Sequence, residues 1–271
     1  MTEDGRGDGA MGEVTGEPEL VAEQRGPVAV LRLNRPEARN ALTPSLMQAL
    51  GAALVEAEGT PDVRAVVLTG TGDRAFCAGM DLKSFAAGDI GLDDGDESRA
   101  FQRLLRGQST VPVVGAANAT AVAGGFELLL GCDLIVLADG ARVGLPEVKR
   151  GLFAAGAGTL LGARLPLPIA LELALTGDTI DAGRARALGL ANAVVPADRV
   201  VPVALEYAER IAANAPLALQ ATKELVRLGV NDLATWQERQ RHWQPLIFAS
   251  EDAREGAVAF AEKRSPQWRG R

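Results

Sequence analysis

The stretch Asn118-Ala-Thr-Ala-Val-Ala-Gly-Gly-Phe-Glu-Leu-Leu-Leu-Gly-Cys-Asp133 decides how this chain is organised. It joins two apolar, β-branched runs, residues 111–115 and 134–137, which are typical of buried strands. Gly124 and Gly125 open its apolar part, and this pattern predicts a helix start that lets the backbone approach a ligand. The first amides of a helix have no partner within it, so they can stabilise negative charge that develops on an oxygen atom.

Glu127 is a lone carboxylate inside this stretch, between Phe126 and Leu128. We expect apolar surroundings to raise its proton affinity, which suits acid–base chemistry near neutral pH. A helix cap or a solvent-facing glutamate gives the same local pattern. The choice between these interpretations depends on the rest of the chain.

Length and composition exclude several classes of protein. The chain has 271 residues, of which 47% are hydrophobic, enough for one α/β core with an appendage. A net charge of −7 and an aromatic content of 4% disfavour nucleic-acid partners. The N-terminus lacks the pattern of a signal peptide, and charged residues interrupt the most apolar run, residues 119–138. We therefore expect a cytoplasmic protein without a membrane-spanning segment.

Cysteine and histidine are too scarce for two common kinds of site. Cys77 and Cys132 show no metal-ligand spacing, and we expect two buried thiols in a reducing compartment. His242 is the only histidine, which disfavours a Ser-His-Asp triad and a multi-histidine metal site. We expect no metal, and we place His242 at the surface or at an interface.

Strand and helix signals alternate through most of the chain, and this alternation indicates an α/β core. Residues 20–24 and 28–33 predict a hairpin, and Thr43-Pro44 predicts the start of a helix that runs to about residue 58. Further signals predict strands at 64–70, 111–115, 134–137 and 190–195, and helices at 97–106, 168–175 and 182–188.

The two ends of the chain differ from this core. Residues 1–17 are rich in Gly and Glu and are predicted to be disordered, and the acidic segment 86–96 is predicted to be mobile. From Asp198 the pattern is helical, with expected helices at 198–213, 217–229, 232–243 and 251–263. The predicted organisation is a tail (1–17), an α/β core (18–197) and a C-terminal helical region (198–271).

Four segments together resemble the enoyl-CoA hydratase/isomerase (crotonase) family. They are Leu33-Asn-Arg-Pro-Glu-Ala-Arg-Asn-Ala-Leu42, Ala75-Phe-Cys-Ala-Gly-Met-Asp-Leu-Lys83, the stretch quoted first, and Gly144-Leu-Pro-Glu147 followed by Leu175-Thr-Gly-Asp-Thr-Ile-Asp-Ala182. Their order and spacing carry the resemblance, which covers about residues 18–268. It implies an α/β spiral of β-β-α units with a C-terminal helical trimerisation region, in a homotrimer or a homohexamer.

The resemblance also implies a coenzyme A thioester substrate and no separate cofactor. The thioester oxygen would lie between the backbone amides of Met80 and Gly124, where each donor contributes about 3 kcal/mol. Position by position, the pantetheine and adenine path falls on Ala38, Met80, Asp81, Leu82 and Lys83, beside Gly124. Arg39 and Lys263 are candidates for the phosphates, and ordinary solvated charge is an equal alternative for both.

Hydratases of this family carry two glutamates, which fall here on Glu127 and Glu147. Two carboxylates in one site separate into base and acid. Our hypothesis is that Glu127 orients and deprotonates water while Glu147 holds or delivers the proton at Cα, and the sequence leaves the reverse order open. Without the resemblance, Glu147 would be taken for a first-turn helix residue after Pro146.

The predicted function is therefore a trans-2-enoyl-CoA hydratase, a hydro-lyase of fatty acid β-oxidation. Double-bond isomerisation, which needs a single glutamate, or another acyl-CoA lyase reaction is the alternative within the family. A non-catalytic acyl-CoA or RNA-binding protein is disfavoured, because both glutamates are present and the chain is acidic. Departures from the family pattern at Met80, Ala123, Phe126 and residues 151–159 fall where the acyl chain is expected.

Overall fold

The structure is a computed structural model that describes residues 17–88 and 93–271. The sequence prediction of a disordered tail falls almost wholly on residues 1–16, outside the described residues. The centre of the predicted mobile segment, residues 89–92, lies outside them too.

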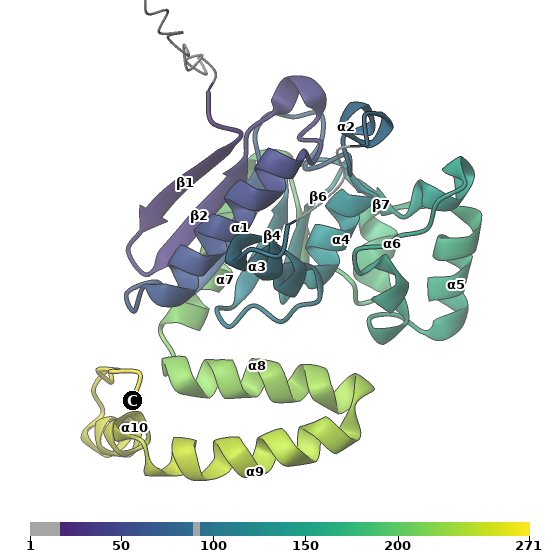
Figure 1. Ribbon diagram of the computed structural model, residues 1–271. Coiled ribbons are helices and arrows are strands. Elements are labelled where there is room, and N and C mark those ends of the chain that lie inside the picture. Colours follow the sequence, from purple (N-terminus) through teal and green to yellow (C-terminus); the bar gives the residue numbers. More distant parts are fainter. Residues whose placement is uncertain (1–16, 89–92) are drawn as a thin grey trace, which may run out of the picture.

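A six-stranded sheet forms the centre of the molecule (Figure 1). Its first two strands form an antiparallel hairpin, which confirms that prediction, and the remaining pairs are parallel. In spatial order the strands are β1 (Leu20–Arg25), β2 (Val28–Leu33), β3 (Ala65–Gly70), β4 (Val113–Ala117), β6 (Leu134–Ala138) and β9 (Ala193–Val195). Parallel strands need crossover connections, which explains the alternation of helices and strands in the sequence.

Helices cover both faces of this sheet. Strand residues alternate between the faces, so Leu31 and Leu33 pack with α1 (Pro44–Gly59) and α3 (Asp96–Leu105). Val28 and Val30 pack on the other face, against α7 (Val200–Ala212). Alanines at positions 204 and 208, four residues apart, let α7 lie close to the strands. This helix begins the predicted C-terminal region, yet it packs as part of the core.

Shorter elements surround the site that is described below. A three-stranded sheet joins β5 (Ala121–Val122), β7 (Arg142–Gly144) and β8 (Thr179–Asp181). The predicted caps are present: Thr43 accepts a hydrogen bond from the amide of Leu46, and Asp181 accepts one from that of Arg184. The other short elements are the helices α2 (Leu82–Ala86), α4 (Gly124–Gly131), α5 (Leu167–Thr176) and α6 (Ala182–Ala187), and 3-10 helices at Pro36–Ala38, Pro146–Arg150, Gly158–Ala163 and Ala197–Arg199.

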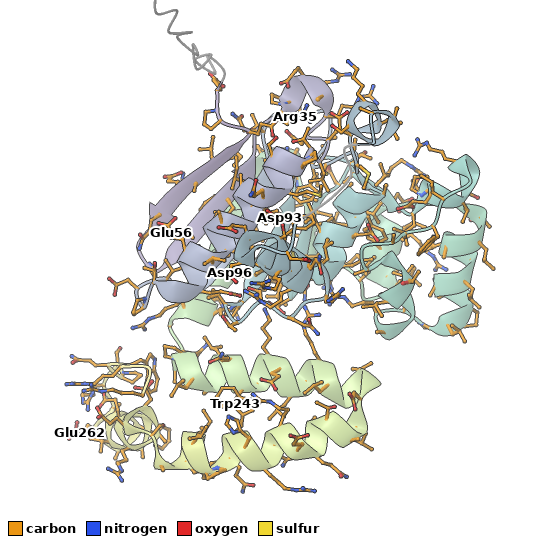
Figure 2. All side chains as sticks on the ribbon, viewed as in Figure 1. Arg35, Glu56, Asp93, Asp96, Trp243 and Glu262 are labelled. Carbon is orange, nitrogen blue, oxygen red and sulfur yellow. The ribbon has the colours of Figure 1, made fainter. Side chains whose placement is uncertain are left out.

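The last three helices form an arm that extends away from the core (Figure 1): α8 (Pro216–Asn231), α9 (Leu233–Ala249) and α10 (Glu251–Glu262). The predicted end of α9 at residue 243 is wrong, because the helix continues through Pro245. The buried Trp243 holds this part of α9 against α8, and its Nε1 donates to Glu224 at 3.0 Å (Figure 2). None of the described helices is long and apolar enough to cross a membrane.

A polar cluster joins α8 to the core. The carboxylate of Asp133 accepts hydrogen bonds from Lys223 and Arg227 of α8, both at 2.8 Å, and from the amide of Val113. Arg227 also donates to the carbonyls of Gly131 and Cys132 at the end of α4, where a cation is favoured by the helix dipole. Burial lowers the pKa of Lys223, and the Asp133 charge opposes this change.

The cysteines and the histidine lie where the sequence predicts. Cys77 and Cys132 are free and buried, and burial raises the pKa of each thiol to about 12. These thiols are therefore unreactive at neutral pH. His242 is exposed on α9.

Candidate active site

The site is built on the start of α4, where the sequence predicts a helix. Ala123, which precedes it, has φ 52° and ψ −132°, a backbone conformation that favours glycine. The amide of Gly124 follows this bend as the first in the helix, so it has no acceptor within α4. A Cβ on Gly125 would lie 2.2 Å from the carbonyl oxygen of Cys77. Only glycine therefore lets α4 approach the loop at residues 77–81.

That loop brings the amide of Met80 beside the amide of Gly124. Leu42 donates to the carbonyl of Gly79 at 2.8 Å and accepts from Asp81 at 2.9 Å, so the amide of Met80 points away from Leu42. A Cβ on Gly124 would lie 3.7 Å from the nitrogen of Met80. Within the described residues, neither the Met80 nor the Gly124 amide donates a hydrogen bond. These two free donors can hold one oxygen atom.

A cavity of about 740 Å³ opens beside the two amides. Apolar side chains of α1, α3 and residues 152–153 form much of its wall, and Glu127 and Glu147 both face into it. The full lining comprises Ala38, Ala41, Leu42, Met47, Ala78, Met80, Asp81, Leu82, Phe101, Gln102, Leu105, Arg106, Ala123, Gly124, Glu127, Glu147, Arg150, Leu152, Phe153, Ala155 and Gly156.

Glu127 lies one turn into α4 and is 6% exposed. Its Oε1 accepts hydrogen bonds from the amides of Ala157 and Gly158, at 2.9 and 2.7 Å. The apolar neighbours that the sequence predicts are buried around Glu127, but two backbone donors also face its carboxylate. Its Oε2 lies against Gly156, where a Cβ would be only 2.7 Å away. The segment that follows Glu147 thus holds the side chain of Glu127.

Glu147 has a different environment. It follows Pro146 in the first turn of a 3-10 helix, and its Oε2 is buried without a hydrogen-bond partner in the described chain. Burial raises the pKa of Glu147, and the nearby charge of Glu127 adds to this, while its own backbone amide and Arg150 act in the opposite direction. The two glutamates of the cavity are therefore not equivalent.

Most of the residues expected from the sequence meet in this cavity. They are Ala38, Met80, Asp81, Leu82, Gly124, Glu127 and Glu147. Arg39, Lys83 and Lys263 do not line it, and Lys263 ends α10 in the arm. Contacts of these three with coenzyme A therefore stay predictions.

The sequence analysis missed several groups of the site. The amides of Ala157 and Gly158 support Glu127 across about 30 residues of chain, and backbone donors leave no mark in a sequence. Arg106 and Arg150 line the cavity without any motif to indicate it. Arg35 was also missed, although it donates a hydrogen bond to Asp81 beside Met80. Its position in the family-like segment Leu33–Leu42 could have marked it as a candidate.

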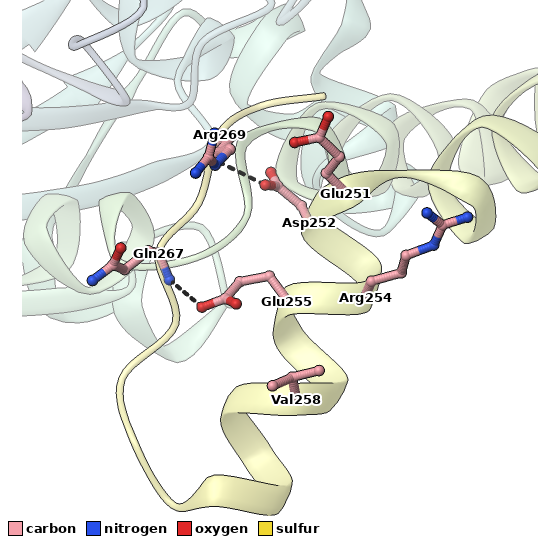
Figure 3. A pocket seen from close by; sticks show the side chains of 7 residues that line it. All are labelled: Glu251, Asp252, Arg254, Glu255, Val258, Gln267 and Arg269. Atoms are coloured by element: carbon pink, nitrogen blue, oxygen red, sulfur yellow. Dashed lines mark hydrogen bonds between the residues drawn. The ribbon is translucent and has the colours of Figure 1, made fainter.

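A second cavity of about 460 Å³ lies between α10 and the last residues of the chain (Figure 3). Its carboxylates already have backbone partners: Asp252 accepts from the amides of Arg269 and Gly270, and Glu255 accepts from that of Gln267. These bonds fasten the end of the chain to α10. The third carboxylate of this cavity, Glu251, pairs with Arg271 at 3.3 Å, so each of the three has a partner within the described chain.

Comparison with known proteins identifies the family. The model of the enoyl-CoA hydratase/isomerase family matches residues 23–271. The chain belongs to this family. Its two glutamates and two free amides therefore lie in the fold of an enzyme family, which confirms the predictions of the family and of an enzyme.

Relatives named as hydratases or dehydratases agree with this assignment. Enoyl-CoA hydratase EchA19 of Mycobacterium tuberculosis is 36% identical, over 96% of this chain and all of the relative. Carnitinyl-CoA dehydratase of Proteus mirabilis is 38% identical, over 91% of this chain and 97% of the relative. The crystal structure of enoyl-CoA hydratase EchA1 from Mycobacterium marinum is 42% identical and covers 94% of this chain and all of its own, with a TM-score of 0.87. The predicted crotonase fold is confirmed.

Proposed function

We propose that this enzyme of the enoyl-CoA hydratase/isomerase family is a hydro-lyase that adds water reversibly across the double bond of a trans-2-enoyl-CoA. The observation that carries the proposal is the meeting of Glu127 and Glu147 in one cavity with the free amides of Met80 and Gly124. Hydration needs all four groups: two donors for the thioester oxygen and two carboxylates for the two proton movements.

The reaction follows from this arrangement. The thioester oxygen accepts hydrogen bonds from the two amides, which stabilise it as negative charge builds up. Glu127 takes a proton from water while the water oxygen forms a bond to Cβ, and the π electrons move to give the thioester enolate. Glu147 then delivers a proton to Cα, which gives the 3-hydroxyacyl-CoA. After the reaction Glu127 carries the proton taken from water and Glu147 has lost one. Transfer of one proton from Glu127 to Glu147 restores the starting state of both carboxylates.

The environments of the two glutamates support this division of roles. Glu147, whose pKa is raised by burial, retains a proton to higher pH than an exposed glutamate does, so it suits the acid. Glu127 accepts two amide hydrogen bonds, which fix the orientation of its carboxylate in the cavity. A carboxylate held in this way suits the base that orients and deprotonates water.

The cavity wall indicates a mainly apolar acyl group. Met47, Phe101, Leu105 and Phe153 line it together with the two glutamates. A fatty enoyl-CoA fits this lining, and we propose a role in fatty acid β-oxidation on that ground. We also propose a cytoplasmic homotrimer or homohexamer, in which the arm of each chain contacts a neighbour and Arg39, Lys83 and Lys263 contact coenzyme A.

The loss of the conjugated thioester absorbance tests the proposal. Crotonyl-CoA and a longer trans-2-enoyl-CoA are added separately to the wild type, Glu127→Gln and Glu147→Gln. We expect turnover by the wild type and a decrease of several orders of magnitude in each variant. A wild type inert toward every enoyl-CoA would contradict hydration, and fully active variants would show that other groups carry the protons.

A further inference from the structure

The two proposed oxyanion donors are supported very differently. Gly124 is the first residue of α4, so the packing of that helix holds its amide in place. Met80 lies in a loop, two residues before the first residue of the short helix α2, so its amide needs support from elsewhere. A shift of about 1 Å at a catalytic group is enough to cost about 100-fold in rate.

The support for Met80 comes from the segment Asn34–Leu42. Backbone hydrogen bonds tie the two segments together: Ala78 donates to Arg39 at 3.1 Å, in addition to the pair that Leu42 makes with Gly79 and Asp81. This parallel bridge sets the direction in which the Met80 amide points.

The supporting segment has an unusual backbone of its own. Arg39 and Asn40 are consecutive residues in the left-handed region, with φ values of 54° and 53°. The side chain of Asn40, which is fully buried, accepts from the amide of Arg35 at 2.9 Å and donates to the carbonyls of Thr71 and Ala75 at 3.0 Å. Such a conformation persists only where surrounding contacts hold it.

Arg35 clamps both sides of the bridge. Its Nη1 donates to the carbonyl of Ala41 at 2.6 Å, next to Leu42, and to Oδ2 of Asp81 at 3.1 Å, next to Met80. Its Nε pairs with Glu19 at 2.8 Å. The side chain of Arg35 is only 17% exposed, so solvent screens these contacts little. Figure 2 shows Arg35 at the end of the core where α2 lies.

The other oxygen of Asp81 faces the start of α2 and accepts from the amide of Lys83 at 3.0 Å. Burial acts to raise the pKa of Asp81, but the Lys83 amide and Arg35 outweigh it and hold this pKa below its ordinary value. Asp81 is therefore ionised in the working enzyme. Arg35 both fixes this carboxylate and offsets its negative charge beside the proposed oxyanion.

We propose that Arg35 is a positioning residue of the oxyanion hole, which acts through Asp81 to hold the amide of Met80 in place. This inference rests on the proposed function, because it needs a thioester oxygen at that amide. Without Arg35, the side-chain contacts that hold the bridge are lost, and the carboxylate of Asp81 remains uncompensated next to the developing negative charge. The transition state is therefore destabilised more than the bound substrate is.

The test compares binding of an enolate with binding of a ground-state thioester. Arg35→Met, Arg35→Lys and Asp81→Asn are assayed for kcat and KM with crotonyl-CoA, and for affinity toward acetoacetyl-CoA, which ionises to an enolate, and saturated butyryl-CoA. We expect Arg35→Met to lower kcat and acetoacetyl-CoA affinity about 10- to 100-fold, with butyryl-CoA affinity within about 3-fold. Arg35→Lys, which keeps the charge, should recover part of the loss.

Arg103→Met is the matched control. Arg103 of α3 pairs with Glu58 of α1 at 2.6 Å and does not line the cavity, so this variant loses an arginine–carboxylate pair away from the site and should keep both affinities. If Arg35→Met does not fold, Asp81→Asn gives the same contrast. The double variant Arg35→Met with Asp81→Asn should lose less than the product of the two single effects.

Three results would overturn the inference. If Arg35→Met and Asp81→Asn both keep the wild-type kcat and enolate affinity, Arg35 does not position the Met80 amide. The proposed hydratase function would still stand in that case. Equal losses for acetoacetyl-CoA and butyryl-CoA would show a general structural effect instead. A wild type that neither hydrates crotonyl-CoA nor binds acetoacetyl-CoA would remove the proposed function and this inference together.

Discussion

At the scale of single residues, the main result is that two glutamates in one cavity have opposite surroundings. Glu127 is held by two backbone amides, while an oxygen of Glu147 is buried without a partner among the described residues. An unpartnered buried polar atom costs folding free energy, and such costs are typical of functional sites. This asymmetry is the basis on which we propose Glu147 as the acid and Glu127 as the base.

The raised pKa of Glu147 predicts a pH dependence of activity. A reaction that uses its proton proceeds below this pKa and is lost as pH rises through it, so kcat/KM should fall on the alkaline side of a pH profile with crotonyl-CoA. Glu172→Gln, a change on the exposed face of α5, should leave the profile unchanged. A wild-type profile that stays flat to alkaline pH would contradict the assignment of Glu147 as acid.

The same shift predicts a pH dependence of stability. Because the pKa of Glu147 is raised in the folded protein, its contribution to the free energy of unfolding decreases as pH rises from the ordinary value of a glutamate through the raised one. Glu147→Gln removes this decrease. Urea unfolding at neutral pH should show the variant at least as stable as the wild type. A less stable variant, while inactive, would show that the charge of Glu147 supports the fold.

Gly156→Ala tests the support of Glu127. The added Cβ would lie 2.7 Å from Oε2 of Glu127, so we expect this side chain to move and kcat to fall about 100-fold, with little change in unfolding. Gly162→Ala, in the same Gly/Ala-rich part of the chain, is the control because its Cβ meets nothing closer than 3.8 Å. Equal activity of the two variants would mean that Glu127 adapts freely.

At the scale of elements, the sequence predicted what local chemistry determines. Thr43 and Asp181 marked helix starts, and unbroken apolar runs marked the buried strands. Strand β8 was not predicted, because three residues are too few to show an alternating hydrophobic pattern. The predicted end of α9 came too early, because the packing of Trp243 outweighs the cost of Pro245 within the helix. The backbone donors to Glu127 depend on a contact that only the folded chain defines.

The junction of α8 with the core gives a prediction at this scale. Asp133→Asn leaves Lys223 and Arg227 without their shared carboxylate in a largely buried site, so unfolding in urea should show a loss of about 3–5 kcal/mol. Asp178→Asn breaks the exposed pair with Lys149 and should change nothing measurable. If both variants were equally stable, the cluster would not hold α8 in place.

At the scale of the whole molecule, the arm exposes large apolar side chains that a single chain leaves uncovered. Phe248 is 78% exposed and Phe260 is 87% exposed, on α9 and α10. Exposed apolar groups of this size are typical of interaction surfaces. The sequence predicted this region as helical, but the fact that it extends from the core is seen only in the structure (Figure 1).

Light scattering tests the proposed assembly. We expect a mass three or six times the 28.3 kDa of the chain, and we expect Phe248→Asp with Phe260→Asp to shift it toward one chain. Val55→Asp, on α1 and 39% exposed, is the control that should leave the mass unchanged. A wild type with the mass of a single chain would contradict the proposed trimer.

The mass of the product that wild-type enzyme makes from crotonyl-CoA in oxygen-18 water tests the central claim most directly. Hydration by Glu127 and Glu147 predicts a 3-hydroxyacyl-CoA heavier than the substrate by one labelled water molecule. A product of unchanged mass would show that the enzyme shifts the double bond without adding water, and would contradict hydration.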